Sequence, residues 1–329
     1  MSQPPTPSDM PISGDTIGAL LAHAEQRLRA AGLAFGHGTT NAHDEAAWLL
    51  LWCLGLPLDS PLDAPPDDLA PLPEAGSAAP PASVFHQPVT QADQERVAQL
   101  IEERIRSRKP AAYLTRQAWL QGVPFYVDER AIVPRSLIAE LLADASIDPW
   151  LHANSRRVLD LCTGNGSLAV LAAMAWPEVE VTGADLSADA LAVAQINIQQ
   201  HGLQERITLV QGDGLAAAPG PWDLVLCNPP YVNSRSMALL PAEYRAEPAL
   251  ALAGGEDGMD FIRQLLQQLP AQLAQDGVLV LEIGHEKPFF EAAFSSLPVF
   301  WLDTSAGDEQ VLLITAQALR AWAADGAAG

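Results

Sequence analysis

The sequence predicts an α/β protein with a doubly wound, mostly parallel sheet and a small helical domain ahead of it. From Arg157 onward, short apolar strand-like runs alternate with segments of helical periodicity. A Gly-rich turn follows the first of these runs, and a double-proline turn follows the fourth. Before residue 110, apolar residues recur at helical spacing.

The overall charge is strongly acidic. The 329 residues include 18 Lys+Arg and 40 Asp+Glu, which gives a formal net charge of −22 and a pI of about 4.5. A protein that grips duplex nucleic acid by its phosphates needs the opposite balance, so direct DNA binding is not expected. Acidity favours solubility and also a basic partner, and composition alone leaves both explanations open.

The cysteines and the lengths of the apolar runs indicate the cellular compartment. Cys53, Cys162 and Cys227 are odd in number and form no Cys-x-x-Cys pair, so neither a disulfide framework nor a metal site is predicted. The first residues lack the basic and apolar regions of a signal peptide, and no apolar run is long enough to span a bilayer. We therefore expect a cytoplasmic protein with no membrane partner.

The N-terminal part is expected to be a helical recognition domain. Residues 1–13 are predicted to be a disordered tail, and 14–109 a helical domain that recognises substrate. Its helices are predicted at 15–31, at 42–54 with Asn41 as N-cap, and from the cap Thr90 to Ser107. The Pro- and Ala-rich stretch 57–90 is predicted to be an extended, partly mobile loop.

A change of period predicts a linker and then a second domain, in which all the candidate site motifs lie. Residues 110–135 are expected to form a β-hairpin linker, with strands at 118–120 and 123–127 around Gln121-Gly122. The catalytic domain is predicted at 136–329, beginning with a helix that Ser136 caps and that continues to about Ser146.

Seven strands are predicted in the catalytic domain. They are expected at 157–161, 179–184, 207–211, 223–228, 277–283, 298–302 and 310–315, with helices at 167–175, 188–201, 259–275, 286–295 and 317–323. The linker around Gly307 is too short for a helical crossover, so the last two strands should pair antiparallel.

The Gly-rich turn is a candidate cofactor loop. Gly164 and Gly166 permit positive φ and close approach to a ligand, in a loop that also contains Cys162, Thr163 and Asn165. About 20 residues later, Asp185 ends a strand where its carboxylate can accept both hydroxyls of a ribose. The same spacing partly fits a nicotinamide-dinucleotide fingerprint, with Ala169 in place of the third glycine.

Three features favour S-adenosyl-L-methionine over a dinucleotide. Asp160 is expected within the turn, where it can meet the ammonium of the methionine part, whereas a carboxylate there would repel a pyrophosphate. Asp213, with Gly214 beside it, follows the third strand and can accept a hydrogen bond from the adenine amine. The Asn228 turn is the third feature. Each carboxylate alone could instead be a helix cap.

The stretch Asn228-Pro229-Pro230-Tyr231 follows the buried run 222–226 and should lie at the carboxyl edge of the sheet. Two prolines stiffen the turn. The Asn228 side-chain oxygen and the Pro229 carbonyl could accept the two protons of a planar –NH2 group, and Tyr231 could pack on its face. The alternative is an ordinary turn in which Asn228 bonds its own backbone.

The order of these motifs resembles that of the protein-(glutamine-N5) methyltransferases. The stretches 243–248 and 253–258 are also similar to theirs. The resemblance implies a class I S-adenosylmethionine-dependent methyltransferase, Rossmann-like with a seven-stranded sheet. It also implies a helical N-terminal domain joined to the catalytic domain by a hairpin, and methyl transfer to a glutamine side-chain nitrogen.

The stretches 35–39, 110–115, 125–130 and 133–138 are similar to the branch that acts on large-subunit ribosomal protein L-three. This implies a basic ribosomal protein as partner, met before or during ribosome assembly. The chain departs from the family pattern at Cys162, which takes the first glycine position, at Asn165, a common Ser position, and in the expanded stretch 57–90.

Three alternatives remain at this stage. The release-factor branch carries an Arg-Pro-Glu-Thr-Glu type sequence where this chain has Val133-Pro134-Arg135-Ser136. An adenine-amine nucleic-acid methyltransferase would use the same Asn-Pro-Pro-Tyr logic on a flipped base. A non-enzymatic adaptor could retain the fold. No dedicated general base is evident in the sequence.

Overall fold

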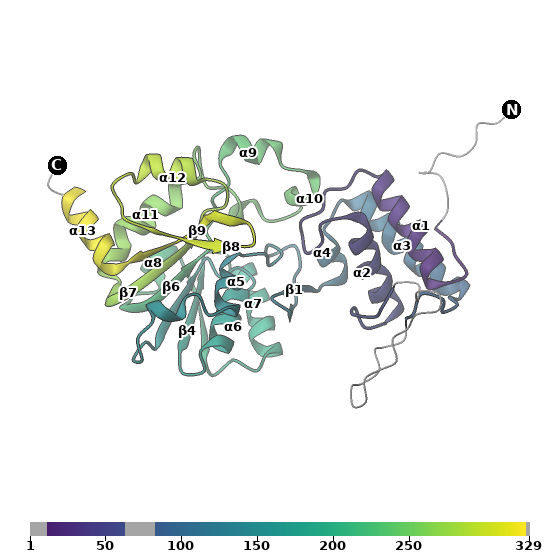
Figure 1. The fold of residues 1–329 in the computed structure, drawn as a ribbon, viewed down its shortest axis with the longest axis horizontal. Helices are drawn as coiled ribbons and strands as arrows, with labels where there is room; N and C mark the ends of the chain where they lie inside the picture. Colours follow the sequence, from purple (N-terminus) through teal and green to yellow (C-terminus); the bar gives the residue numbers. More distant parts are fainter. Residues whose placement is uncertain (1–11, 63–82, 327–329) are drawn as a thin grey trace. The chain divides into compact units, whose positions relative to one another are not determined.

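The computed structural model describes residues 12–62 and 83–326 (Figure 1). Most of the predicted tail (1–11) and the centre of the Pro-rich stretch (63–82) lie outside the described residues. The chain divides into two compact units, Met1–Thr115 and Arg116–Gly329. The predicted linker 110–135 is therefore shared between them: its first residues form a short helix of the first unit, and its hairpin belongs to the second.

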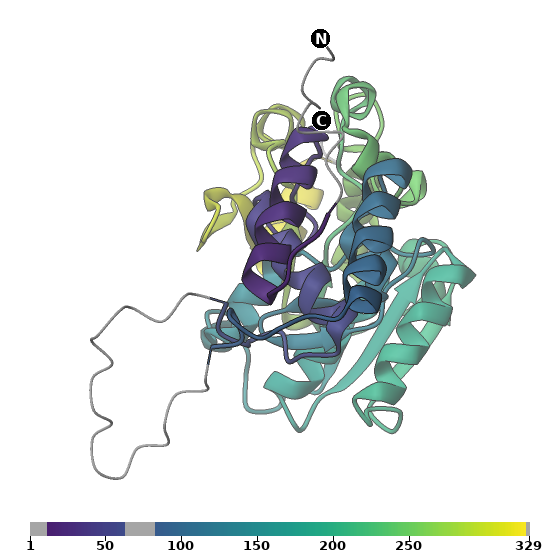
Figure 2. The same cartoon turned by 90° about the vertical axis from the view of Figure 1, so that its right-hand side faces the viewer.

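The first unit contains four helices in its described residues. They are α1 (Ile17–Ala30), α2 (Ala42–Leu54), α3 (Gln91–Ser107) and α4 (Ala111–Thr115). The predicted caps are confirmed, since the side chains of Asn41 and Thr90 accept backbone N–H groups of Asp44 and Asp93. Helices α1 and α3 run side by side (Figure 2), joined by an Arg27–Glu102 ion pair.

The segment 83–90 is fastened to α1, although the sequence predicted it as part of a partly mobile loop. Ile17 and Gly18 donate their backbone N–H groups to the carbonyls of Gln87 and Phe85, at 3.0 and 2.9 Å. A Cβ on Gly18 would lie 2.4 Å from the Phe85 ring. Only glycine allows the ring to approach the helix this closely.

A seven-stranded sheet organises the second unit. Its spatial order is β5-β4-β3-β6-β7-β9-β8, formed by β3 (Arg157–Leu161), β4 (Glu180–Asp185), β5 (Ile207–Gln211), β6 (Trp222–Cys227), β7 (Leu273–Glu282), β8 (Phe300–Thr304) and β9 (Gly307–Thr315). The first five strands in this order are parallel. The predicted antiparallel pairing of the last two strands is confirmed, and β9 inserts between β7 and β8.

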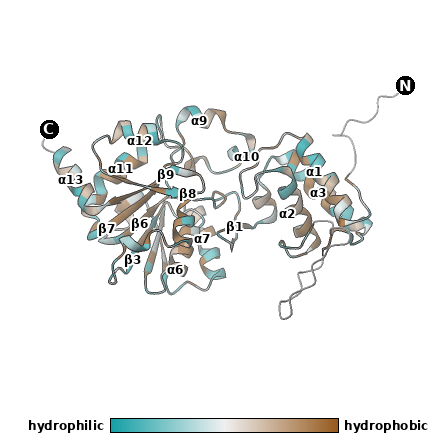
Figure 3. Cartoon of the chain, in the orientation of Figure 1, coloured by the Kyte–Doolittle hydropathy of each residue, from teal (hydrophilic) through white to brown (hydrophobic). Residues whose placement is uncertain are grey.

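Helices cover both faces of the sheet. One face carries α5 (Ile138–Ala143), α6 (Ser167–Ala175) and α7 (Ala188–Gln200); the other carries α8 (Gly214–Ala217), α11 (Asp260–Gln268), α12 (Lys287–Ala293) and α13 (Ala316–Gly326). Strand residues alternate between the two cores, as Val158 and Leu159 do. The strands are accordingly coloured mainly hydrophobic in Figure 3.

The predicted hairpin forms from β1 (Ala118–Leu120) and β2 (Val123–Phe125). Gln121 and Gly122 have φ of 49° and 75°, as a two-residue turn of this kind requires. Phe125 enters the core on the α6 side of the sheet. The side chain of Asn197 in α7 bonds both the N–H and the C=O of Tyr126, so the hairpin is attached to the sheet unit.

Short elements complete the unit. They are α9 (Ser234–Leu239), α10 (Ala242–Arg245) and the 3-10 turns η2 (Asp148–Trp150), η3 (Ala249–Ala251) and η4 (Leu269–Ala271). In the described residues no helix combines the length and the apolarity that crossing a membrane requires.

Two sequence expectations about element ends are wrong. The helix predicted over 259–275 ends at Gln268, because Pro270 lies in the turn η4 and has no N–H to continue it; β7 begins at Leu273. Ser136 is not the cap of α5: Leu137 takes that position, the helix ends at Ala143, and the Ser136 hydroxyl donates to Glu282 instead.

Candidate active site

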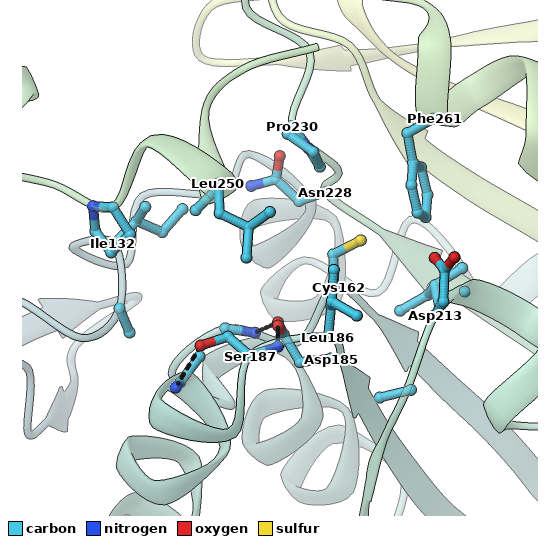
Figure 4. A pocket seen from close by; sticks show the side chains of 18 of the residues that line it. Ile132, Cys162, Asp185, Leu186, Ser187, Asp213, Asn228, Pro230, Leu250 and Phe261 are labelled. Atoms are coloured by element: carbon cyan, nitrogen blue, oxygen red, sulfur yellow. Dashed lines mark hydrogen bonds between the residues drawn. The ribbon is translucent and has the colours of Figure 1, made fainter.

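The site lies where the strand order reverses, between β3 and β6. Here a first cavity encloses about 830 Å³ of space, part of it open to solvent. Loops that follow β3, β4, β5 and β6 line it (Figure 4). The predicted residues that line it are Cys162, Gly164, Asp185, Asp213, Gly214, Asn228 and Pro230.

The loop after β3 turns sharply beside this cavity. Cys162, Gly164 and Gly166 all have positive φ, at 61°, 57° and 78°. This conformation is unusual for Cys162, which carries a side chain at a position suited to glycine. Figure 4 shows the Cys162 side chain just below Asn228.

Asp160 lies within β3, not in the turn as predicted, and is 1% exposed. One carboxylate oxygen accepts hydrogen bonds from the Thr163 hydroxyl (2.5 Å) and the Ala169 N–H (3.0 Å). The other oxygen is buried and receives no hydrogen bond from the described residues. Burial raises the pKa of Asp160 to about 7. It is thus an acceptor that the protein itself does not satisfy.

Thr163, Asn165 and Gly166 do not line the cavity but build the loop. The Asn165 side chain accepts the Ser167 N–H and donates to the Ile132 carbonyl. A Cβ on Gly166 would lie 2.9 Å from the Cβ of Ala194, so this glycine lets α6 and α7 approach each other.

Asp160 does not line the cavity, whereas the carboxylates Asp185 and Asp213 do. The Asp185 oxygens accept the N–H groups of Gly164 and Ser187, both at 2.9 Å, and burial raises the pKa of this group. Each oxygen retains a lone pair for a ligand hydroxyl. Asp213 precedes α8 without capping it through its side chain, and the Phe261 ring lies beside it (Figure 4).

The Asn228 amide is not used by the protein. In the described parts of the chain no hydrogen bond reaches this side chain or the Pro229 carbonyl, so the interpretation that Asn228 bonds its own backbone is wrong. Asn228 lines the first cavity together with Pro230. It also lines a second cavity together with Pro229 and Tyr231, and so lies where the two cavities meet.

The second cavity encloses about 1070 Å³, part of it open to solvent, and brings together residues that sequence reasoning missed. Arg135 forms a bidentate ion pair with Glu247, at 2.6 and 2.7 Å, and lies over the Tyr244 ring. Glu282 ends β7 in the wall of this cavity. The position of Glu282 at the carboxyl end of a strand could have marked it as a site residue. No sequence signal indicates that Arg135 contacts Glu247 and Tyr244.

Comparison with known proteins places the chain in a class. The family model "Methyltransferase small domain" matches residues 139–243. A sheet with one antiparallel strand, and a cavity lined by carboxylates at its switch point, agree with this match. The fold and the site therefore define a class I methyltransferase, a class that uses S-adenosylmethionine.

Similarity over nearly the whole chain identifies the family. The relative "Ribosomal protein uL3 glutamine methyltransferase" of Bordetella pertussis is 49% identical over 92% of this chain and 96% of its own length. Proteins of the same description from Burkholderia pseudomallei and Neisseria meningitidis serogroup B are 48% and 45% identical, over 94% and 92% of this chain and 98% and 94% of theirs. The chain belongs to the family of ribosomal protein uL3 glutamine methyltransferases.

Proposed function

We propose that this enzyme methylates the side-chain amide nitrogen of a glutamine in ribosomal protein uL3, the large-subunit protein L-three. S-adenosylmethionine supplies an electrophilic methyl group when bound. The observation that carries the proposal is the place of Asn228, whose unused amide lies where a cavity lined by carboxylates meets a second cavity open to solvent.

The first cavity fits the cofactor by the chemistry of its acceptors. Asp160 lies two residues before the cavity-lining Cys162, and its unsatisfied oxygen suits the ammonium of the methionine part. Asp185 has lone pairs left for the two ribose hydroxyls, and Asp213 beside Phe261 can accept from the adenine amine. Cys162, Gly164 and Gly214 supply the backbone walls.

The double-proline turn orients the acceptor. An amide nitrogen is a poor nucleophile because its lone pair is delocalised, so it must be held at near-attack distance. The Asn228 side-chain oxygen and the Pro229 carbonyl accept its two N–H groups, which also stabilises the positive charge that develops on them. Pro230 stiffens the turn, and Tyr231 flanks the acceptor group.

The substrate is a basic protein, and the enzyme carries a net charge of −22. Opposite charges steer the two together while the substrate is not covered by ribosomal RNA. We therefore place the reaction before or during assembly of the large subunit, in the cytoplasm, and assign substrate docking to the helical N-terminal unit.

A substrate panel tests the proposal. Purified enzyme is incubated with methyl-labelled S-adenosylmethionine and, separately, isolated uL3, a peptide release factor and adenine-rich oligonucleotides. Label is expected in uL3 alone. Label in the release factor or the oligonucleotide, with none in uL3, would assign the enzyme to a different substrate class.

A further inference from the structure

The turn Asn228–Tyr231 is braced by glycines from two other segments. A Cβ on Gly254 would lie 2.7 Å from the Tyr231 Cα, and one on Gly258 would lie 2.2 Å from the Tyr231 carbonyl oxygen. Val232 exchanges backbone hydrogen bonds with Leu252 and Gly254, at 2.8 and 2.9 Å. The stretch 252–258 therefore holds the backbone of Tyr231 so closely that a side chain would displace it.

The Tyr231 ring is confined as well. Its edge lies against Gly284, where a Cβ would come within 2.5 Å of the ring carbon Cε2. Its hydroxyl donates to Oε1 of Glu282, at 3.2 Å. Backbone, ring edge and hydroxyl are thus all fixed by neighbouring segments.

Glu282 is itself anchored on its other side. Its Oε2 accepts the Ser136 hydroxyl at 2.6 Å and the Leu137 N–H at 2.9 Å. The carboxylate is 4% exposed at the end of β7, whose neighbour β6 leads into the Asn228 turn. Its hydrogen-bond partners in the described residues are two hydroxyls and one backbone N–H, and all three can donate to a carboxylate.

We propose that Glu282 is a positioning residue for methyl transfer: held by Ser136 and Leu137, it accepts the Tyr231 hydroxyl and so fixes the ring against the acceptor amide. Glu282 acts through Tyr231 and does not itself touch the reacting atoms. If the Tyr231 ring could rotate freely, the space beside the acceptor amide would widen. Small displacements of the reacting nitrogen from its near-attack position reduce the rate steeply. This inference rests on the proposed function, because it concerns the acceptor side of the same site.

Three variants separate positioning from charge and from folding. Tyr231→Phe removes only the hydroxyl and keeps the ring, Glu282→Ala removes the anchor, and Glu282→Gln keeps a hydrogen-bonding group on both sides without the charge. Glu286→Gln is the matched control: Glu286 is another buried glutamate just after β7, it accepts from Asn233, and it lines neither cavity.

The measurements are kcat and KM with uL3 and the Kd for S-adenosylmethionine by calorimetry. In Tyr231→Phe and Glu282→Ala, kcat is expected to fall about tenfold or more, the effect of losing a hydrogen bond to a charged group. KM for uL3 and the cofactor Kd should stay within about twofold. Glu282→Gln and the control should retain most of the activity. The double variant Tyr231→Phe/Glu282→Ala should be no slower than the slower single variant.

Several outcomes would overturn the inference. One is that Tyr231→Phe keeps its kcat; another is that the two losses multiply in the double variant. A third is that the kcat of Glu282→Gln falls as far as that of Glu282→Ala, because the charge of Glu282 and not its position would then matter. If Glu282→Ala fails to fold, Tyr231→Phe and Glu282→Gln still decide the question. Absence of uL3 methylation by the wild-type enzyme would instead contradict the proposed function.

Discussion

At the scale of single residues, the side chains of the site divide into those the protein uses and those it leaves open. The Asn228 amide and one oxygen of Asp160 receive no hydrogen bond from the described residues. Thr163, Asn165 and Gly166, by contrast, are committed to the loop itself. Polar groups left unsatisfied in a cavity are the ones a ligand can complete.

Replacing Asn228 by Ala should separate chemistry from cofactor binding. Its side chain is proposed to orient the acceptor, so kcat with uL3 should fall by roughly 100-fold or more while the Kd for S-adenosylmethionine changes little. Single-turnover kinetics and calorimetry measure the two. Equal losses of both would show that Asn228 serves the cofactor and not the acceptor.

We predict that cofactor binding depends on pH through Asp160. Its pKa of about 7 means that roughly half of these carboxyl groups are protonated at pH 7. An ammonium beside the carboxylate lowers this pKa, so binding at pH 7 should release about half a proton from Asp160. Between pH 7 and 6 the Kd should rise up to about fivefold, because a larger fraction of the free enzyme must lose a proton before it binds.

Calorimetry in buffers of different ionisation enthalpy counts the released protons. The Asp160→Asn variant should bind more weakly and lose this pH dependence. If wild type and variant release the same number of protons, Asp160 only fastens the loop through Thr163 and Ala169.

At the scale of elements, helix α2 is fastened to α3 by a buried ion pair. Arg104 is 0% and Glu45 2% exposed, and their side chains meet at 2.8 Å. Burial raises the pKa of Glu45 despite the neighbouring guanidinium. Such an ion pair stabilises the folded protein little more than apolar side chains in its place would. Removing one member, however, leaves a buried charge without its partner.

Glu45→Ala should therefore destabilise the first unit by roughly 3–5 kcal/mol. Chemical denaturation followed by tryptophan fluorescence and circular dichroism measures this. Glu95→Ala, on the exposed face of α3, is the control and should change stability by at most about 0.5 kcal/mol. Replacing both partners by apolar residues, Glu45→Leu with Arg104→Met, should restore most of the loss; failure to do so would mean the pair is needed for more than mutual neutralisation.

The elements most predictable from sequence are those whose apolar residues recur at a regular spacing over many residues. Helices α1 to α3 and strand β3 lie where the apolar spacing puts them, because packing and propensity agree there. The helix predicted over 259–275 is too long, because leucines at 265, 266, 269 and 273 continue a helical period past Pro270. Helices α4, α8, α9 and α10 span too few residues to show a period at all.

The site was predictable only in part, for a related reason. Asp185, Asp213 and Asn228 follow strands directly, so topology alone brings them to one edge. Glu282 and Tyr231 are far apart in the chain, and Arg135 meets Glu247 across a still longer separation. Nothing local in the sequence encodes which of these side chains pair.

At the scale of the whole molecule, we propose that the net charge of −22 speeds the encounter with a basic substrate. The association rate of enzyme and uL3 should fall roughly tenfold or more between low and high salt, because electrostatic steering is screened beyond a Debye length. Stopped-flow fluorescence measures it, with the salt dependence of cofactor binding as the control. An association rate insensitive to salt would leave the charge of −22 without a role in recognition.

The central claim is that a rigid turn presents a side-chain amide nitrogen to a methyl donor. Its most direct test is fragmentation mass spectrometry of uL3 after reaction with wild-type enzyme and with Asn228→Ala. The account predicts one added methyl group on the side-chain nitrogen of a single glutamine with the wild type, and almost none with the variant. A methyl group on a carboxylate, a lysine or the backbone, or equal methylation by both enzymes, would contradict it.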